Sequence, residues 1–379
     1  MGNTWKGISE AELQETERKV LSYSGLDYDN IFIENVVVDD FGNYARTIHI
    51  GDRSKIKLVM FHGYGASGII FYKILKPLSE KFHVILVDIL GMGASSRPEF
   101  TAKDAVEGDQ FFVDFIENWR IAMGDLKDFY LAGHSFGGYI CGHYASRYPQ
   151  NIRKLLMLSA VGVPEKPNDF DITKKQFKKG QGPPKWVRGL AGTVWRQKWS
   201  PFGVMRKSGS LLGKRIIKGY LGKRMGMLPP EEFDAMLNYM HQIFMKEGSS
   251  EYAIFICFHL GMYAINPLEA EERLGNKNLN LPMSFWYGDR DWMDVEPGQK
   301  IVENSKYGSK LNFVYVVNDS DHHMYMDNPE EFARQIIYDI EYTEDRLHLL
   351  IPHDPQSETQ LINNQEEESK QNFDSQTQA

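Results

Sequence analysis

Residues 129–138 read Phe-Tyr-Leu-Ala-Gly-His-Ser-Phe-Gly-Gly, and this stretch decides the fold. It contains the pattern G-x-S-x-G, in which Gly133 and Gly137 flank Ser135, between an apolar run and a helix-compatible stretch over 138–148. A strand, a sharp turn and a helix hold a serine on a strained backbone with its hydroxyl accessible. Glycine is needed on both sides because the strand and the helix pass too close for a Cβ atom. In a chain with 33 glycines the pattern also arises by chance, so the rest of the sequence has to support it.

A second glycine-rich turn lies where acyl-transfer chemistry at a serine needs one. The apolar run 57–61 predicts a buried strand that ends in His62-Gly63-Tyr64-Gly65. A turn in this position supplies one backbone N–H to the developing oxyanion, and the residue after the nucleophile supplies the other. We therefore predict that the N–H groups of Tyr64 and Phe136 form the oxyanion hole.

Two later strands end in residues that complete such a site. The run 283–287 leads into Gly288-Asp289-Arg290-Asp291, and the run 311–317 leads into Asp319-Ser320-Asp321-His322-His323. The order Ser135, then Asp291, then His322 is the chain order of the α/β-hydrolase fold, and it differs from the orders found in chymotrypsin and subtilisin.

The chemistry explains why these residue types are needed. A serine hydroxyl is a poor nucleophile at neutral pH, so an imidazole has to take its proton during attack. A carboxylate fixes the tautomer of that imidazole and stabilises it once it is charged. We predict Asp291 as the acid and His322 as the base. Asp289 and Asp294 remain alternative acids, and His323 is the alternative base.

The glycine-rich turn after the predicted strand 57–61 also matches a nucleotide-binding motif. Residues 63–68 read G-x-G-x-x-G after a predicted strand, and the acidic Asp88 follows, as in a dinucleotide-binding fingerprint. The preceding stretch, 30–49, is typical of an antiparallel hairpin, whereas a nucleotide-binding fold begins with a parallel strand. A nucleotide hypothesis also leaves the serine turn and the histidine loop unexplained. We therefore predict no cofactor.

Strands and helices alternate along most of the chain, which predicts an α/β fold with a mostly parallel sheet and helices on both faces. After a hairpin over 31–50, the expected strands are 58–61, 84–88, 129–132 and 155–159, and the expected helices are 70–81, 104–123 and 138–148. The predicted domain organisation is a peripheral N-terminal helix (1–28), an α/β-hydrolase core (29–163 and 281–347), an inserted basic helical lid (164–280) and a disordered tail (348–379).

The net charge of −8 is unevenly distributed along the chain, and one segment is strongly basic. Residues 164–225 contain 16 Lys and Arg against three acids, hence +13, and aromatic residues are interleaved with them: Phe177, Trp186, Trp195, Trp199 and Phe202. Cationic segments with tryptophan suit an anionic phospholipid surface, although a solvated face is the alternative. We expect no nucleic-acid partner, because no such motif is present and the acidic remainder would repel a polyanion. Two cysteines and no secretory signal predict a cytoplasmic protein.

Four motifs together resemble one branch of the α/β-hydrolase superfamily. They are His62-Gly63-Tyr64-Gly65, Asp88-x-x-Gly91-x-Gly93-x-Ser95, Gly133-His134-Ser135-Phe136-Gly137-Gly138-Tyr139 and His322-His323-x-Tyr325-x-Asp327-x-Pro329. The branch contains the N-acylphosphatidylethanolamine lysophospholipase and the lipid-droplet lipase co-activator, with plant and fungal phospholipid deacylases beside them.

The resemblance implies a fatty acyl ester of a phospholipid or lysophospholipid as substrate, at a peripheral membrane or lipid-droplet surface. It also implies an H-x-x-x-x-D pattern, here His322 to Asp327, that the family associates with lysophosphatidic acid acyltransfer. The co-activator lacks the nucleophile, whereas this chain keeps Ser135, which favours an active serine hydrolase. The acid loop 288–294 departs from the animal members. A soluble small-ester hydrolase and a non-enzymatic lipid-surface scaffold are the remaining alternatives.

Overall fold

The computed structural model describes residues 9–170 and 192–347. The chain divides into two compact units, 1–337 and 338–379, and the described part of the second unit continues helix α12 (Pro329–Glu344). The predicted tail over 348–379 lies outside the described residues, as does 171–191 with Phe177, Trp186 and six of the basic residues of the lid. No helix in the described part is long and apolar enough to cross a membrane.

The first unit is built on a sheet whose eight described strands run in the order β1-β2-β4-β3-β5-β6-β7-β8. Strands β1 (Ile31–Val37) and β2 (Tyr44–Ile50) form an antiparallel hairpin, and β2 is antiparallel to β4. All other neighbours are parallel: β3 (Lys57–Phe61), β4 (His83–Val87), β5 (Phe129–His134), β6 (Ile152–Leu158), β7 (Met283–Gly288) and β8 (Phe313–Val317). The predicted α/β-hydrolase fold is confirmed.

Parallel strands that are covered on both faces read as nearly continuous apolar runs. Every residue of β4, β5 and β7 is buried, and in β3 only the first residue is partly exposed. Because the carboxyl ends of the parallel strands lie at one edge of the sheet, the segments that follow β3, β5, β6, β7 and β8 meet there.

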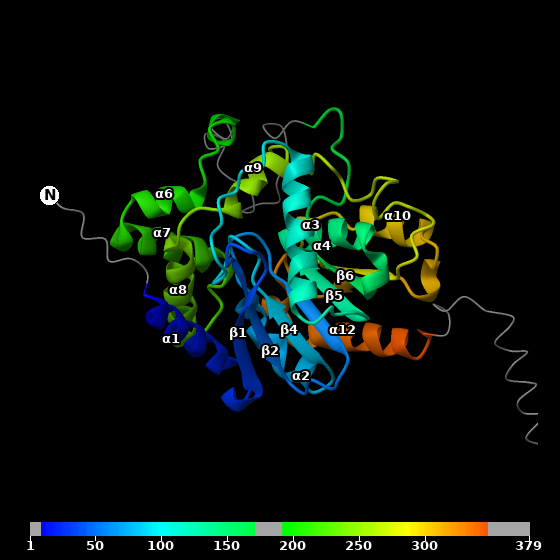
Figure 1. Cartoon of the computed structure of the whole chain (residues 1–379), viewed down its shortest axis with the longest axis horizontal. Coiled ribbons are helices and arrows are strands. Elements are labelled where there is room, and N and C mark those ends of the chain that lie inside the picture. Colours follow the sequence, from blue (N-terminus) through cyan, green and yellow to red (C-terminus); the bar gives the residue numbers. More distant parts are fainter. Residues whose placement is uncertain (1–8, 171–191, 348–379) are drawn as a thin grey trace, which may run out of the picture. The chain divides into compact units, whose positions relative to one another are not determined.

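Two helices after the central strands agree with prediction. Asp104 caps α3 (Ala105–Ala122), because its carboxylate accepts the N–H of Glu107 at 3.0 Å. Helix α4 (Phe136–Arg147) starts directly after the serine, packs on β5 and β6, and contacts α3 beside it (Figure 1). The helix predicted over 70–81 is corrected: a 3-10 run, Gly68–Ile74, leads into the short α2 (Leu75–Ser79). Pro77 in α2 has no N–H to close an α-helical turn with the preceding run.

Between β6 and β7 the described residues form helices and no paired strands. These helices are α6 (Pro201–Lys207), α7 (Ser210–Arg224), α8 (Pro230–Met245) and α9 (Ala253–Cys257). Helix α7 packs against α6 and α8, and α8 in turn packs against α1 (Glu10–Leu21) (Figure 1).

Helix α1 begins after Ser9, whose hydroxyl accepts the N–H of Glu12, as the sequence predicts. Its inner face carries Leu13, which is fully buried, and Glu17, whose carboxylate forms an ion pair with Arg46 of β2. Burial of a charge requires such a partner. The pair therefore ties α1 to the sheet.

Candidate active site

The serine turn has the geometry of a strained nucleophile. Ser135 lies between β5 and α4 with φ 54° and ψ −114°, a conformation that residues with a Cβ rarely adopt. A Cβ on Gly133 would lie 2.5 Å from the carbonyl oxygen of Gly137, and a Cβ on Gly137 would lie 2.4 Å from that of His62. The neighbouring backbone therefore leaves no room for a Cβ atom at either position, as the sequence predicts.

The structure brings the three predicted side chains together. The Oγ atom of Ser135 lies 3.0 Å from Nε2 of His322, and Nδ1 of His322 lies 3.3 Å from Oδ1 of Asp291. All three side chains are buried, with Ser135 the most accessible at 9 % exposure. His323, the alternative base, is directed elsewhere, with its Nε2 3.4 Å from a guanidinium nitrogen of Arg224.

The three candidate acids have different surroundings. Burial alone would raise the pKa of Asp291, but hydrogen bonds from His322 and Ser159 outweigh it, so this pKa is lowered and the carboxylate stays charged. Asp289 is exposed and accepts the N–H of Ser320 at 2.9 Å, which caps the turn after β8. Asp294 is exposed. Of the three, Asp291 alone lies within hydrogen-bond distance of the imidazole.

Two residues near the serine carry contacts that the sequence did not reveal. Ser159, the residue after β6, places its hydroxyl 2.7 Å from Nδ1 of His322 and 2.5 Å from Oδ2 of Asp291. His134, which precedes the serine, donates from Nε2 to the carbonyl oxygen of His322 at 2.9 Å. Burial lowers the pKa of His134 well below its ordinary value, so its ring is neutral and one nitrogen carries the donated proton. No sequence motif predicts either role. Ser159 and His134 contact residues that follow other strands, β7 and β8, and these contacts form only in the folded sheet.

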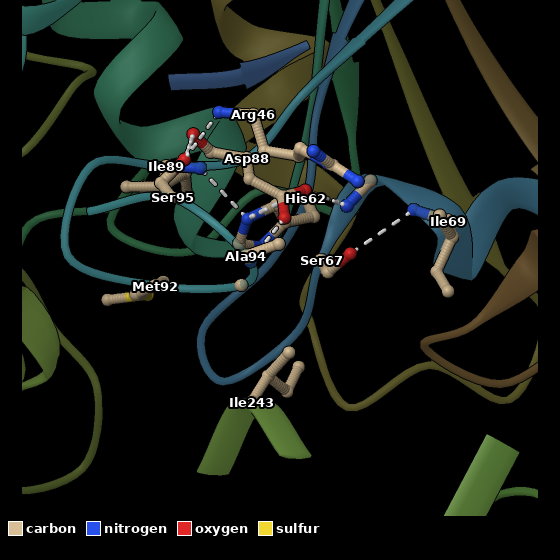
Figure 2. A network of polar contacts seen from close by, with 12 residues as sticks. Arg46, His62, Ser67, Ile69, Asp88, Ile89, Met92, Ala94, Ser95 and Ile243 are labelled. Carbon is tan, nitrogen blue, oxygen red and sulfur yellow. Dashed lines mark hydrogen bonds and ion pairs between the residues drawn. The ribbon is translucent and has the colours of Figure 1, made fainter. Parts of the chain in front are cut away.

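His62 fixes the turn that follows β3. Its Nδ1 donates to the carbonyl oxygen of Gly63 at 2.8 Å, and its Nε2 accepts the N–H of Ile89 at 3.0 Å (Figure 2). Burial lowers the pKa of His62, which keeps the neutral tautomer that this pattern needs. The imidazole therefore connects the predicted oxyanion turn to the end of β4.

Asp88 also links the segment after β3 to the segment after β4. One carboxylate oxygen accepts the N–H of Gly68 at 2.5 Å, and the other accepts the N–H of Ala94 at 2.6 Å (Figure 2). Its backbone carbonyl accepts the hydroxyl of Ser95. Both carboxylate oxygens are thus used inside the protein and do not face a ribose.

The two residues predicted to form the oxyanion hole come from different elements, Tyr64 from the turn after β3 and Phe136 from the start of α4. Phe136 is the first residue of α4, and the first N–H groups of a helix have no carbonyl of their own helix to donate to. The aromatic ring of Tyr64 is held by its hydroxyl, which donates to the carbonyl oxygen of Glu251 at 3.0 Å, and by Phe202, whose ring centroid is 5.4 Å away.

A pocket opens beside the serine. Its lining combines turn residues, histidines and apolar side chains from the inserted helices: Gly63, Tyr64, Gly65, Ala66, Ile70, His134, Ser135, Tyr220, Leu221, Arg224, Met225, Met240, His322, His323 and Tyr325. The guanidinium of Arg224 is its cationic group. It contacts the neutral imidazole of His323, whose pKa is lowered by burial, and the ring of Tyr220, whose centroid is 5.0 Å away.

Asp327, the acidic member of the H-x-x-x-x-D pattern, lies away from this lining. Its Oδ2 atom accepts the N–H of Asp321 at 2.8 Å, and burial raises its pKa. It therefore braces the loop that carries His322. Among the described residues no cluster of His, Cys, Asp and Glu could hold a metal ion.

Comparison with known proteins gives several relatives in lipid metabolism. The chain is 29 % identical over 287 residues to a probable 1-acylglycerol-3-phosphate O-acyltransferase of Oryza sativa subsp. japonica, covering 74 % of this chain and 66 % of that protein. It is 28 % identical to the 1-acylglycerol-3-phosphate O-acyltransferase ABHD5 of Homo sapiens, covering 86 % and 88 %. It is 27 % identical to the (lyso)-N-acylphosphatidylethanolamine lipase of Mus musculus, covering 86 % and 90 %. The chain thus spans just under two thirds of the length of the plant relatives that it matches.

Solved structures share the fold at lower identity. A membrane phospholipase A, described as a bacterial virulence factor, superposes with a TM-score of 0.59 at 20 % identity, covering 88 % of this chain and 91 % of that one. The carboxylesterase CesB of Bacillus subtilis has a TM-score of 0.58 at 16 % identity, covering 87 % and 97 %. Residues 57–329 match the family described as alpha/beta hydrolase fold. The resemblance drawn from the sequence motifs is confirmed, and the chain belongs to the alpha/beta hydrolase fold family.

Proposed function

We propose that this protein is a serine hydrolase that cleaves fatty acyl esters of phospholipids or lysophospholipids through an acyl-enzyme on Ser135. The observation that carries the proposal is the hydrogen-bonded arrangement of Ser135, His322 and Asp291, with 3.0 Å between the hydroxyl and the imidazole. A nucleophile and its general base need such a hydrogen-bond distance, and Asp291 is the third group that orients the base.

The reaction follows from the atoms involved. The Oγ atom of Ser135 attacks the ester carbonyl while Nε2 of His322 takes the hydroxyl proton. The N–H groups of Tyr64 and Phe136 stabilise the oxyanion, and each such donor is worth about 3–4 kcal/mol in known enzymes. The imidazolium then protonates the leaving alcohol. Water attacks the acyl-enzyme with His322 again as base, which releases the fatty acid and restores Ser135.

The cavity supports a lipid substrate that carries a negative charge. Apolar side chains such as Leu221, Met225 and Met240 offer contacts to an acyl chain, and Arg224 offers a guanidinium to a phosphate in the same cavity. The names of the relatives agree in chemical class, because 1-acylglycerol 3-phosphate and N-acylphosphatidylethanolamine both contain an acyl ester and a phosphate.

The surface of α7 supports action at an anionic lipid surface, either a membrane or a lipid droplet reached from the cytoplasm. Its sequence contains five Lys and Arg residues and no acid. Leu212 is 53 % exposed and Ile216 is 36 % exposed, beside the exposed bases Lys214, Arg215 and Lys218. An exposed helix that combines apolar and cationic residues suits a phospholipid interface.

Acyl transfer to a lysophospholipid is the second candidate, because several relatives carry the name of a 1-acylglycerol-3-phosphate O-acyltransferase. It would use the same acyl-enzyme, with a lipid hydroxyl in place of water. The contacts of Asp327 favour a bracing role in the loop, so we propose that transfer needs no further acid from the H-x-x-x-x-D pattern.

One experiment separates these candidates. Purified wild-type and Ser135→Ala proteins are incubated with 1-acylglycerol 3-phosphate, the matching monoacylglycerol and p-nitrophenyl butyrate, and fatty acid and phosphatidic acid are quantified. We expect Ser135-dependent release of fatty acid, fastest from the phosphate-bearing lipid. Ser135-dependent phosphatidic acid would establish transfer, and turnover of the butyrate alone would establish a small-ester hydrolase. A folded wild-type protein without turnover or fluorophosphonate labelling would be a scaffold.

A further inference from the structure

Ser159 is a buried serine for which the reaction above has no step. It follows the last residue of β6, its side chain has 0 % exposure, and its N–H donates to the carbonyl oxygen of Trp286 at 2.8 Å. Its φ of 46° lies in the left-handed region, which residues other than glycine seldom adopt. Such conformations persist where the surrounding structure holds them, and they concentrate at functional sites.

The hydroxyl of Ser159 lies between the acid and the base. Its Oγ atom is 2.7 Å from Nδ1 of His322 and 2.5 Å from Oδ2 of Asp291. The direct distance between Nδ1 of His322 and Oδ1 of Asp291 is longer, at 3.3 Å. The path through the serine therefore consists of two short hydrogen bonds, whereas the direct path is one long hydrogen bond.

The direction of these hydrogen bonds is fixed by the nucleophile. Nε2 of His322 must accept the hydroxyl proton of Ser135, so Nδ1 carries the other proton. Nδ1–H then donates to Oγ of Ser159, and the hydroxyl of Ser159 donates to the carboxylate. We infer that Ser159 is a positioning residue, through which Asp291 fixes the tautomer and orientation of His322.

The hydroxyl of Ser159 also stabilises the positive charge that develops on His322 during the reaction. When Nε2 takes the proton of Ser135, the imidazolium faces a hydroxyl dipole whose oxygen is already directed at it and whose hydrogen is directed at Asp291. No proton leaves Nδ1 or Ser159. The carboxylate cannot turn away, because the N–H of Met293 donates to its Oδ1 atom at 3.1 Å. Preorganised dipoles of this kind stabilise charge without reorganisation.

The inference rests on the proposed function, and two variants test it by kinetics. Ser159→Ala and Ser159→Gly both remove the hydroxyl, and glycine also accepts the positive φ without strain. We expect kcat to fall by about 10- to 100-fold in both, as for the loss of a hydrogen bond to a charged group, with KM little changed. Ser284→Ala is the matched control: this serine of β7 is also fully buried, but its Oγ atom accepts the N–H of Phe313. The control should keep its kcat.

A double-mutant cycle distinguishes positioning from packing. If Asp291 acts through Ser159, the Ser159→Gly/Asp291→Asn protein should be no slower than Asp291→Asn alone, because residues that act as a unit do not add. Additive losses would overturn the inference. So would an unchanged kcat in both serine variants while the wild type turns over by Ser135, and this result would leave the proposed function intact.

A spectroscopic measurement on the folded protein does not depend on turnover. The Nδ1 proton of His322 is expected to give a low-field ¹H NMR resonance that disappears in His322→Ala. In Ser159→Gly this resonance should move, because its acceptor is gone, whereas Ser284→Ala should leave it in place. A resonance that is identical in wild type and Ser159→Gly would overturn the inference even for a protein that lacks hydrolase activity.

Discussion

The imidazole of His134 donates a hydrogen bond from Nε2 to the backbone carbonyl of His322 at 2.9 Å. The residue before the nucleophile thus holds the loop that carries the base, although the two residues are 188 positions apart in the chain. Its other nitrogen lies 3.5 Å from the hydroxyl of Tyr325, which belongs to the same loop. His134, the last residue of β5, therefore holds the loop of His322, and Ser135, the proposed nucleophile, follows it directly in the chain.

Replacing His134 tests this relationship. His134→Leu removes the donor, and we expect kcat on p-nitrophenyl butyrate to fall by about 10- to 100-fold, because a small misplacement of a catalytic group is costly. His134→Gln should recover much of the loss, since its amide nitrogen can donate from a position close to that of Nε2. Melting temperatures serve as the control for folding. Equal kcat values for the leucine variant and the wild type would show that the contact does not position the base.

The two adjacent histidines should differ sharply. His322→Ala removes the base and is expected to lower kcat by about four orders of magnitude, as losses within a triad do. His323→Ala removes a neutral side chain whose ring nitrogen faces Arg224 at the cavity wall and not Ser135, so kcat should change by less than about tenfold. Steady-state kinetics on a soluble ester checks both. The reverse ranking would assign the base to His323.

The basic face of α7 should act only when the substrate is in a lipid surface. Lys214 and Lys218 are exposed one turn apart, and each base near an anionic surface contributes about 1 kcal/mol. Changing both to Gln should therefore weaken binding to vesicles of phosphatidylserine and phosphatidylcholine by roughly 30-fold, with no effect on p-nitrophenyl butyrate. Co-sedimentation at two salt concentrations measures this, because salt shortens the reach of these charges to about 8 Å at physiological ionic strength.

A lysine pair outside α7 provides the control for charge. Lys277 and Lys310 are both exposed; Lys277 precedes β7, and Lys310 ends the 3-10 helix Gly308–Lys310 before β8. The Lys277→Gln/Lys310→Gln protein carries the same net charge as the α7 variant and should bind vesicles like the wild type. Equal weakening in both double variants would mean that net charge, and not the α7 face, governs binding.

Folding stability should fall in mild acid because of a buried histidine pair. Nδ1 of His49 lies 3.1 Å from Nε2 of His83, and Nε2 of His49 lies 2.8 Å from a carboxylate oxygen of Glu34. When His49 donates to Glu34 and accepts from His83, the buried Nδ1 of His83 has no partner among the described residues. Burial lowers the pKa of His83 to about 4.

The sign of the effect follows from this pKa. The unfolded chain binds the proton near pH 6.5 and the folded chain only near pH 4, so stability is full above about pH 6.5 and is lost as the pH falls through that window. We expect a loss of about 1–2 kcal/mol from this residue after solvent screening is allowed for. Urea denaturation at pH 7.5 and 4.5 should show a smaller pH dependence in His83→Gln than in the parent, and identical dependence in both would contradict the assignment.

The parts of the site that follow strands were predictable from the sequence. The turns around Ser135 and Tyr64 are marked by glycines that the backbone requires, and the order of serine, acid and histidine is a property of the chain alone. The choice of Asp291 over Asp289 depends on how the turn after β7 closes on the loop after β8: the carboxylate of Asp291 is buried beside the imidazole, whereas that of Asp289 is exposed and accepts the N–H of Ser320.

Other features depend on tertiary contacts that no local pattern records. In the sequence, Ser159 only ends an apolar run. Its contacts with His322 and Asp291 arise because the ends of β6, β7 and β8 lie together in the folded sheet. Arg206 was counted with the basic surface of the lid, yet it forms a partly buried ion pair with Glu251 at 2.6 Å. Pro77 lies inside the helix predicted over 70–81, and the segment instead forms a 3-10 run followed by the short α2.

The most direct test of the account is capture of the acyl-enzyme on Ser135. The wild-type protein is mixed with 1-acylglycerol 3-phosphate or p-nitrophenyl butyrate, quenched in acid within the first turnovers, and analysed by intact-mass and peptide mass spectrometry. We expect a mass increase equal to one acyl group, located on the peptide that contains Ser135 and absent from Ser135→Ala. Turnover without this adduct in a quench that preserves esters, or an acyl group located on another residue, would contradict it.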